Sequence, residues 1–395
     1  MPSNIGKQKR KKEELLNREF YSLRSILGYS WAIFYVLLGG REAGKSYAVT
    51  KFYTEQWVKY RRPFYWFRLT EASKRKLLTN NAEKLIDPDL RRKFKLDIVT
   101  NGDNVYEVTK RDSKGKIVEK ELMARVMDLS TFYNDKGSGL YDADFLNDPN
   151  MYYNICLDEM NKELGEKRQG DIVYQFANQL ENVIRSTKTR TRVIMIGNTL
   201  EEASDLMLGL GFIPEKYGRY KLVKNKRLLQ QFIKERDAAK NYKERQAVDD
   251  KYKDVKFGKR AIVEYIEPSE KYRNRRSNTV GEIWAPDAST FTNEIKVDTT
   301  LIYKSRLVKP QYIIKFSNRE SEWFTVWDNS VIVKYHGEKC KAIAMRPTLN
   351  FEIYSPENQK QIITLFDMRG YLYRDLMTFK DFKKQITLLK PRKNG

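Results

Sequence analysis

Apolar residues recur with the periods of helices and strands along the first half of the chain. Leu16, Phe20, Leu23 and Leu27 are spaced by four, three and four, which predicts one face of an amphipathic helix. The near-continuous apolar run over 31–38 is typical of a central parallel strand covered on both faces. Further elements follow: a helix over 45–60, strands over 64–69, 152–157 and 192–197, and a helix over 171–187. This alternation predicts an α/β fold with a parallel sheet and flanking helices.

The remaining segments have different patterns. Residues 94–127 alternate in polarity and contain the turn signals Asn101-Gly102 and Lys114-Gly115, which predicts antiparallel hairpins added to the sheet. Residues 201–250 are charged and mostly helical in pattern, 251–278 are rich in basic residues, and the chain from 299 onward is rich in strands, with a final helix over 382–389. We therefore expect an α/β domain over 1–250, a basic linker over 251–300 and a mainly β domain over 301–395.

The charge of the chain indicates a polyanionic partner. There are 75 Lys and Arg against 52 Asp and Glu, so the net charge is +23. Nucleic acid is the first expectation and an anionic membrane surface the second. No membrane-spanning segment is expected, because the longest apolar run, over 31–38, is much shorter than the ~20 residues that cross a bilayer. With two cysteines and one histidine, the composition favours neither a disulfide framework nor a histidine-rich metal site.

The segment 39–46 reads GGREAGKS and fits the phosphate-loop pattern G-x-x-x-x-G-K-[ST]. It also lies between a predicted strand and a predicted helix, as the phosphate-binding mechanism requires. Backbone N–H groups of such a loop wrap the phosphates, Lys45 neutralises the outer phosphates, and the Ser46 hydroxyl binds Mg²⁺. Contacts with ATP are therefore expected from Gly39, Gly40, Arg41, Glu42, Ala43, Gly44, Lys45, Ser46 and Tyr47.

A pair of carboxylates follows the apolar strand at 152–157. Asp158 is positioned to hold the Mg²⁺ hydration shell, and Glu159 to polarise the attacking water. The alternative is an ordinary acidic loop, but the phosphate loop makes that the weaker interpretation. A glutamate beside the metal aspartate favours hydrolysis over phosphoryl transfer to a small acceptor. It also predicts a strand inserted between the phosphate-loop strand and the metal-aspartate strand.

Three further residues are candidates with two interpretations each. Asn198 directly follows the strand predicted at 192–197, where a polar residue can sense the γ-phosphate. Alternatively, a helix begins here with Thr199 as its N-cap. Arg68 ends the strand at 64–69, at the nucleotide edge of the sheet or in a surface salt bridge. Arg185 is placed to reach the nucleotide of a neighbouring subunit, or it is a solvated helix end or DNA contact.

The mainly β part lacks the convergent carboxylates that a two-metal nuclease needs, since Asp328, Asp367 and Asp375 are scattered in the sequence. Nuclease activity is therefore not expected. Lysines interleaved with aromatic residues fit phosphate binding or a generic soluble surface: Lys309, Lys315, Lys334, Lys339 and Lys341.

The chain resembles the DNA-encapsidation ATPases of small podophages with protein-primed genomes (Picovirinae type), which are terminase-like. The resemblance rests on GGREAGKSYAVTKFY, PFYWFR, ICLDEM and LENVIRSTKTRTRVIMIGNT, and more loosely on segments after residue 200. It implies an ATPase domain of the additional-strand catalytic-glutamate (ASCE) class with a lid over 1–250, a small linker domain over 251–300, and a C-terminal RNase H-like domain that has lost its nuclease acids. By motif position, Arg185 resembles a finger that acts on the neighbouring subunit. A basic residue that the family has near Glu71 is missing here, so Lys74 or Arg75 is a candidate substitute.

The resemblance also implies partners and a place of action. They are double-stranded DNA, further copies of the chain in a ring that is usually a pentamer, and the portal of a procapsid in the host cytoplasm. Some family members also dock through a structural RNA.

Two other functions stay open on the sequence. One is a helicase-type ATPase acting on DNA or RNA, which needs residues that stack on single strands. The other is a structural nucleic-acid-binding protein with a vestigial phosphate loop. The joint presence of Lys45, Ser46, Asp158 and Glu159 argues against the second.

Overall fold

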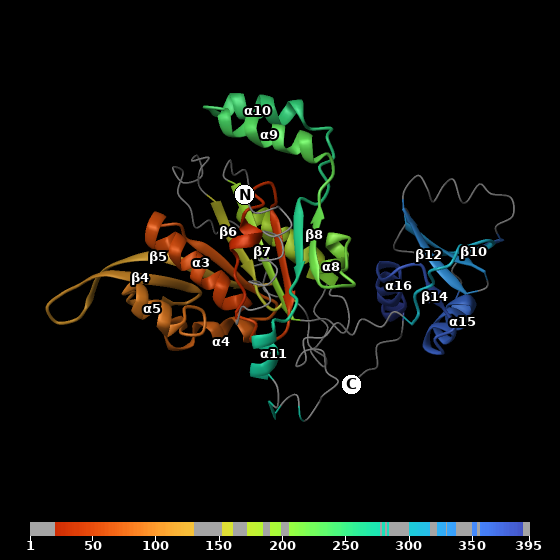
Figure 1. The fold of residues 1–395 in the computed structure, drawn as a ribbon, viewed down its shortest axis with the longest axis horizontal. Coiled ribbons are helices and arrows are strands. Elements are labelled where there is room, and N and C mark those ends of the chain that lie inside the picture. The colour runs from red at the N-terminus through yellow and green to blue at the C-terminus, as the bar shows by residue number, and fades with distance from the viewer. Residues whose placement is uncertain are drawn as a thin grey trace, which may run out of the picture. The chain divides into compact units, whose positions relative to one another are not determined.

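The computed structural model describes residues 20–129, 152–160, 172–184, 190–198, 205–276, 279–280, 283, 300–316, 322–328, 330–336, 350–353 and 356–389. The chain forms two compact units (Figure 1). Unit 1 comprises 1–206 and 214–296, and unit 2 comprises 207–213 and 297–395. Each unit has its own sheet and is described by itself.

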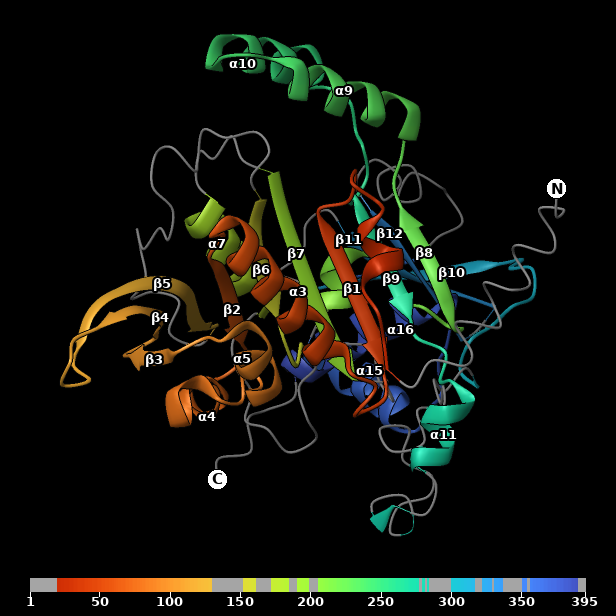
Figure 2. The same cartoon turned by 60° about the vertical axis from the view of Figure 1, so that its left-hand side comes forward.

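A nine-stranded sheet forms the centre of unit 1, in the order β3-β4-β5-β2-β6-β7-β1-β9-β8 (Figure 2). The strands are β1 Phe34–Gly39, β2 Phe64–Arg68, β3 Ile98–Asn101, β4 Asn104–Arg111, β5 Ile117–Asp128, β6 Tyr152–Leu157, β7 Arg190–Asn198, β8 Gly218–Leu222 and β9 Ala261–Tyr265. The six strands from β5 to β9 along this order run parallel, while β3, β4 and β8 are antiparallel to their neighbours. The α/β fold and the parallel sheet predicted from the sequence are confirmed.

Strand β7 lies between β1 and β6 and pairs with both. The inserted strand that the adjacent carboxylates predicted is therefore present. Because parallel strands end at the same edge of a sheet, this order brings the segments that follow β1, β7 and β6 to one edge.

The helices of unit 1 are short to medium in length. They are α2 Arg24–Leu27, α3 Lys45–Tyr60, α4 Glu71–Ala82, α5 Pro88–Phe94, α7 Ile172–Ile184, α9 Lys226–Ala238, α10 Tyr242–Lys251 and α11 Glu270–Arg276, and α8 Asp205–Leu210 lies at the boundary with unit 2. The predicted helix around 16–27 falls mostly outside the described residues, which contain only α2 from it. Among the described residues, every helix is too short or too polar to cross a bilayer.

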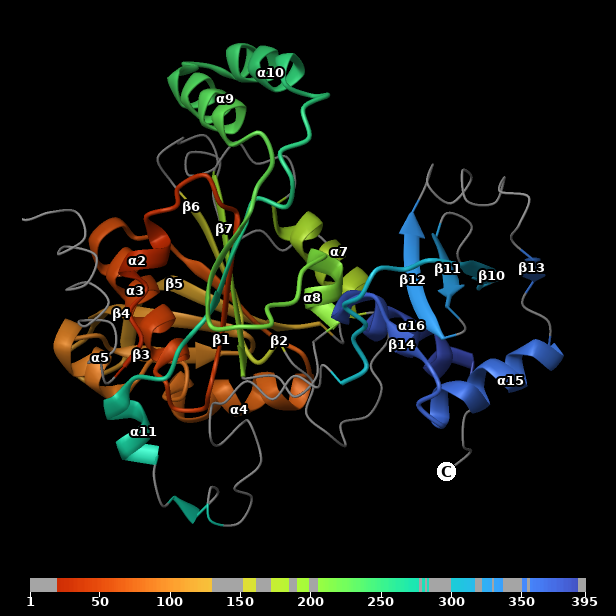
Figure 3. The same cartoon turned by 45° about the vertical axis from the view of Figure 1, so that its right-hand side comes forward.

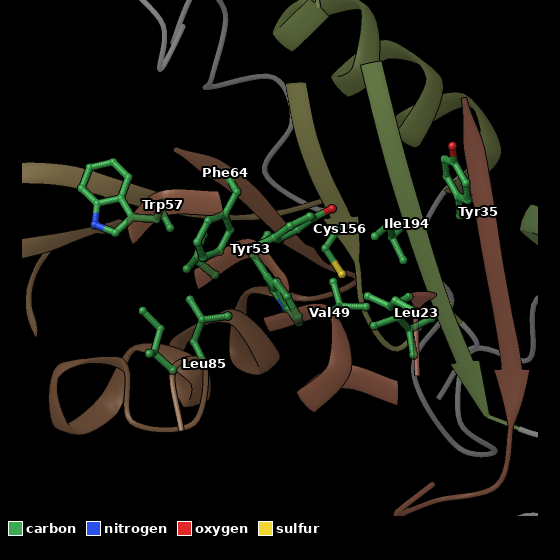
Figure 4. Close-up of a cluster of buried hydrophobic side chains, with 14 of the residues drawn as sticks. Leu23, Tyr35, Val49, Tyr53, Trp57, Phe64, Leu85, Cys156 and Ile194 are labelled. Carbon is green, nitrogen blue, oxygen red and sulfur yellow. The ribbon is translucent and has the colours of Figure 1, made fainter. Parts of the chain in front are cut away.

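The core of unit 1 explains why β2 is apolar throughout. Phe64 packs against Tyr53 of α3 on one face, with the ring centroids 5.1 Å apart (Figure 4). Trp66 packs on the same Tyr53 ring, with the centroids 6.5 Å apart. On the other face Phe67 contacts Phe176 of α7 at 6.5 Å. A strand covered on both faces cannot alternate in polarity, and all five β2 residues are buried. This double cover fixes the position of α3, and so of the loop that precedes it.

The domain boundary predicted at residue 250 does not match the structure, because unit 1 includes residues 214–296. The segment 251–300, predicted to be a separate linker domain, contains β9, which pairs with β1 and β8 in unit 1. The segment 201–250, predicted to be mostly helical, contains the edge strand β8 as well as helices. Both strands are short, and the helical insertion between them separates them in sequence, so neither produced a clear strand pattern.

Unit 2 has a five-stranded sheet in the order β13-β10-β11-β12-β14. Its strands are β10 Pro310–Lys315, β11 Glu322–Trp327, β12 Val331–His336, β13 Asn350–Ile353 and β14 Leu372–Tyr373, and its helices are α15 Pro356–Asp367 and α16 Leu376–Leu389. The two helices lie beside one face of the sheet, where Phe382 of α16 packs on Phe324 at 5.2 Å (Figure 3). The unit is therefore mixed α and β, not mainly β as the sequence predicted. Three predicted strands are confirmed as β10, β11 and β12.

Candidate functional site

The phosphate loop connects β1, which ends at Gly39, to α3, which begins at Lys45. Gly44 has φ +81°, a left-handed conformation that favours glycine. A Cβ at this position would also lie 3.1 Å from the Cβ of Phe20. The loop thus favours glycine here for its backbone conformation, a Cβ would crowd Phe20, and the loop turns the first N–H groups of α3 toward the carboxyl edge of the sheet.

Lys45 is held at the mouth of this loop. Its ammonium donates to the carbonyl oxygens of Gly39 at 2.8 Å and Gly40 at 2.6 Å, and the residue is 5% exposed. Burial lowers the pKa of Lys45 to about 8, and the charge of Asp158 opposes this shift only in part. A buried ammonium in this position neutralises the outer phosphates of a nucleotide.

Ser46 and Asp158 meet although 112 positions separate them in the sequence. The Ser46 hydroxyl donates to Oδ1 of Asp158 at 3.1 Å, across the edge where β7 ends. Asp158 is buried, and burial raises its pKa while the Arg68 guanidinium lowers it. A hydroxyl and a carboxylate oxygen are hard ligands of the kind that Mg²⁺ prefers together with phosphate oxygens and water. These two side chains would hold the ion.

Glu159 lies beside this pair in a strained backbone conformation. Its φ is +56°, and its N–H donates to Oδ1 of Asp158 at 3.0 Å. Unlike Asp158, its side chain is 59% exposed, so it extends into the open cleft. A carboxylate with access to solvent next to a metal ligand is suited to polarise a water molecule.

Arg68 links the two carboxylates. Its guanidinium lies 3.0 Å from Oδ2 of Asp158 and forms a second ion pair with Glu159. Burial disfavours the charge of Arg68, but the two carboxylates together raise its pKa. The residue is 8% exposed, so its guanidinium is buried and does not form a surface salt bridge, and Arg68 lines the same cleft as the phosphate loop.

These residues line one cleft of about 650 Å³. Its volume lies in the range of ligand pockets, roughly 300–1,000 Å³. The predicted site residues that line it are Arg41, Glu42, Ala43, Gly44, Lys45, Ser46, Tyr47, Arg68, Asp158, Glu159 and Asn198. Gly39 and Gly40 contribute through the carbonyl groups that hold Lys45. The structure thus brings together all the described residues that the sequence assigned to the site.

The sequence did not indicate the wall of the cleft formed by the end of α4 and the turn before α5. Lys84, Leu85 and Asp87 line this wall, and Leu77 of α4 lies beside them. Lys84 is exposed, and no carboxylate pairs with it in the part of the chain that the structure describes. An Asp-Pro pair, here at 87–88, is a sequence signal for the start of a helix, but only the packing of α4 and α5 shows that this turn faces the phosphate loop.

The missing basic residue near Glu71 is not replaced by Lys74. Lys74 is buried and forms ion pairs with Asp128 at 3.1 Å and Asp103 at 3.0 Å. These carboxylates raise its pKa although burial opposes the charge. Arg75 is exposed and pairs with Glu71 one turn earlier. The ammonium of Lys74 therefore holds β5 and α4 together.

Other predicted residues lie elsewhere. Arg185 and Thr199 lie outside the described residues, so neither the finger nor the helix cap is described. In unit 2, Lys334 pairs with Asp381, and Lys315 lies 3.8 Å from the Trp323 ring centroid. Lys339 and Lys341 are outside the described residues.

The carboxylates of unit 2 have structural contacts. Asp328 accepts the backbone N–H groups of Val308 and Lys309, and Asp375 accepts that of Thr378 at the start of α16. Within the described residues no three His, Cys, Asp or Glu side chains gather into a metal-binding group.

Comparison with solved structures shows the same fold in phage DNA packaging motors. The chain is similar to the Phi-28 gp11 DNA packaging motor, with a TM-score of 0.56 and 13% identity over 95% of this chain and 100% of that chain. It is likewise similar to the bacteriophage Phi-29 viral genome packaging motor assembly, with a TM-score of 0.55 and 16% identity over 94% and 100% of the two chains. At the level of the fold, the resemblance to terminase-like packaging ATPases that the sequence indicated is confirmed.

No family model matches the chain. No curated protein matches it either.

Proposed function

We propose that this protein is an ATP-driven motor that translocates double-stranded viral DNA into a procapsid. The observation that carries the proposal is the contact between Ser46 of the phosphate loop and Asp158 after β6. It forms the metal-binding pair of a nucleotide site at the edge of the sheet where β7 separates the two segments. The similarity in fold to phage packaging motors supports the same function.

The side chains of the cleft have separate roles in ATP hydrolysis. Gly44 and its neighbours surround the phosphates with N–H groups, and Lys45 neutralises their charge. The chemistry that a bound Mg²⁺ supplies, at Ser46 and Asp158, is neutralisation of charge on the phosphate oxygens. Glu159 accepts the proton of the water that attacks the γ-phosphorus, while the bond to the β–γ bridging oxygen breaks and ADP leaves.

Arg68 controls the position of that glutamate. In the structure its guanidinium pairs with Glu159 and Asp158 at once. Glu159 must separate from Arg68 to reach a water molecule, whereas Asp158 is buried and stays in place. Arg68 is thus a positioning residue for the two carboxylates, and Asn198 at the end of β7 is placed to sense the γ-phosphate.

Assembly of the motor forms the second part of the proposal. Arg185 acts on the nucleotide of the adjacent subunit, so hydrolysis takes place at subunit interfaces of a homo-oligomeric ring, a pentamer. The ring binds duplex DNA and attaches to the portal of the procapsid in the host cytoplasm. The mixed sheet of unit 2, with helices on one face, supports an RNase H-like domain without nuclease acids.

An ATPase assay with and without DNA tests the proposal. Duplex DNA should stimulate turnover by the wild type, and Glu159→Gln should bind ATP without turning it over. Stimulation by single strands together with strand separation would instead identify a helicase-type ATPase. No nucleotide binding by the wild-type chain would refute the proposed function altogether.

A mixing experiment tests the finger. Arg185→Ala and Glu159→Gln should each be inactive, while a mixture of the two should recover part of the turnover. Hybrid interfaces in the mixture pair an intact finger with an intact glutamate. A mixture that stays inactive, although both variants assemble, would contradict action between subunits.

A further inference from the structure

A helical arm is inserted between two neighbouring strands of unit 1. Strands β8 and β9 are antiparallel partners, and Leu222 at the end of β8 lies opposite Ala261 at the start of β9. A short turn would join them, but the chain instead forms α9 and α10 within residues 223–260. Figures 2 and 3 show these helices standing clear of the end of the sheet.

Aromatic contacts and ion pairs hold the parts of the arm together. Phe232 of α9 packs against Tyr252 and Phe257, with ring centroids 5.3 and 5.4 Å apart. Ion pairs join the two helices further out, between Arg236 and Asp249 at 3.0 Å and between Lys251 and Glu235 at 2.8 Å. Neither helix supplies a residue to the nucleotide cleft. The arm therefore has the organisation of a separate interaction element.

Charge is distributed unevenly over the arm. Residues 223–260 contain 13 Lys and Arg against 6 Asp and Glu. Two of the six carboxylates, Glu235 of α9 and Asp249 of α10, form ion pairs between the helices, and the exposed Asp254 lies near the base of the arm. The base of the arm, where the chain leaves and rejoins the sheet, also carries exposed cations that form no ion pair within the described residues. We call this group the arm base: Lys224, Lys226, Arg227, Lys253 and Lys256.

The two sides of the arm base are held next to each other. The N–H of Lys224 donates to the carbonyl oxygen of Phe257 at 2.9 Å, and the Asn225 amide donates to the carbonyl oxygen of Lys256 at 3.3 Å. These bonds bring cations from two chain segments onto one small surface. Like charges repel, so such a surface is stabilised by binding a polyanion.

The arm base does not belong to the nucleotide cleft. It joins β9 at that strand's amino end, whereas the phosphate loop follows the carboxyl end of β1, which is parallel to β9. Five paired residues separate the two ends, about 16 Å at 3.3 Å per residue. The phosphates of a bound nucleotide would therefore leave the arm base unneutralised.

The geometry points to the phosphate backbone of duplex DNA as the partner of the arm base. Single-strand binding uses exposed aromatic rings on which bases stack. Here Phe232, Tyr252 and Phe257 face one another inside the arm, which leaves cations on the surface. Contacts of this kind hold a duplex without reading its sequence. The inference rests on the proposed function and assigns the DNA contact of that motor to a surface.

Two triple variants of the full-length chain test the assignment. The test variant is K224A/K226A/K256A, and the control K76A/K114A/K116A removes the same charge from exposed lysines of α4 and the β4–β5 turn. Affinity for a fluorescent duplex is measured between 50 and 200 mM salt. The test variant should weaken binding at least tenfold at the lower salt and reduce the slope of log affinity against log salt by about 3, roughly one for each lysine. The control should change neither.

Retained nucleotide binding shows that the test variant is folded. Duplex affinity of the test variant equal to that of the wild type, or an equal loss in the control, would overturn the assignment. Stronger binding of single strands than of duplex through the arm base would also overturn it. In each case a wild-type chain that hydrolyses ATP in response to duplex DNA would leave the proposed function standing.

Discussion

Removal of Arg68 should destabilise the protein in a way that depends on pH. The guanidinium lies 3.0 Å from Oδ2 of Asp158, and both side chains are nearly inaccessible, with 10% and 5% of their surface exposed. In Arg68→Ala the Asp158 carboxylate stays buried without its counter-charge. Breaking a buried pair by removing one partner costs about 3–5 kcal/mol. The nearby Glu159 carboxylate, which also raises the pKa of Asp158, adds to the penalty.

The sign of the pH dependence follows from the pKa of Asp158. Burial already raises this pKa in the wild type, and Arg68 is the largest influence that lowers it. Without Arg68 the folded-state pKa rises further above the unfolded value. The folded state then binds more protons than the unfolded state, so stability falls as pH rises through the acidic range. The variant should thus be close to wild type below about pH 4, near the ordinary Asp pKa, and show its full loss at neutral pH.

Urea unfolding without nucleotide, at pH 4 and pH 7, measures this difference. The double variant Arg68→Ala/Asp158→Asn is the control, because a neutral amide does not need the guanidinium. It should recover most of the loss that the single variant shows at pH 7. A single variant as stable as the wild type at pH 7, or a loss that persists in the double variant, would refute the role given to the ion pair.

Three further changes test other parts of the site. Gly44→Ala should abolish nucleotide binding, because φ at this position is +81° and the new Cβ would lie 3.1 Å from Phe20. A fluorescent ATP analogue measures this, and binding equal to that of the wild type would contradict the preference for glycine. Lys84→Ala should weaken ATP binding about tenfold, or ~1.4 kcal/mol, because the variant removes an unpaired cation from the cleft. The control Lys76→Ala, outside the cleft, should bind ATP as the wild type does. Equal ATP affinities of the two variants would exclude a phosphate contact by Lys84. The pKa of Lys45, lowered to about 8, means that the folded state binds fewer protons than the unfolded state between pH 8 and 10.5. The wild type should therefore gain about 3 kcal/mol relative to Lys45→Met across that range in urea unfolding, and parallel pH profiles would show that the ammonium is not buried.

The sequence determined the chemistry that depends on short segments. The strand inserted between the phosphate loop and the acidic pair was predicted correctly, and the two segments meet at one edge of the sheet. A strand covered on both faces is apolar throughout, as β2 is, and a loop that binds phosphate needs Gly44, Lys45 and Ser46 at fixed spacing. Such requirements act within a few residues, so they leave a readable pattern.

Other features depended on contacts between distant segments. Arg68 was identified as a candidate, but its simultaneous pairing with both carboxylates appears only when β2 and β6 are adjacent. Lys74 was a candidate substitute for a missing cation, but in the structure its ammonium pairs with Asp103 and Asp128.

The sequence pattern likewise did not predict β9, the strand by which the chain rejoins the sheet after the helical arm. A strand of five residues gains its stability from hydrogen bonds to its neighbours, here β1 and β8, and little of that is encoded in its own residues. The same holds for Lys84, whose place in the cleft comes from the packing of α4 and α5. Local sequence thus determined which residues are candidates for the chemistry, and only the tertiary structure decided which charges meet, because ion pairing depends on distance in space.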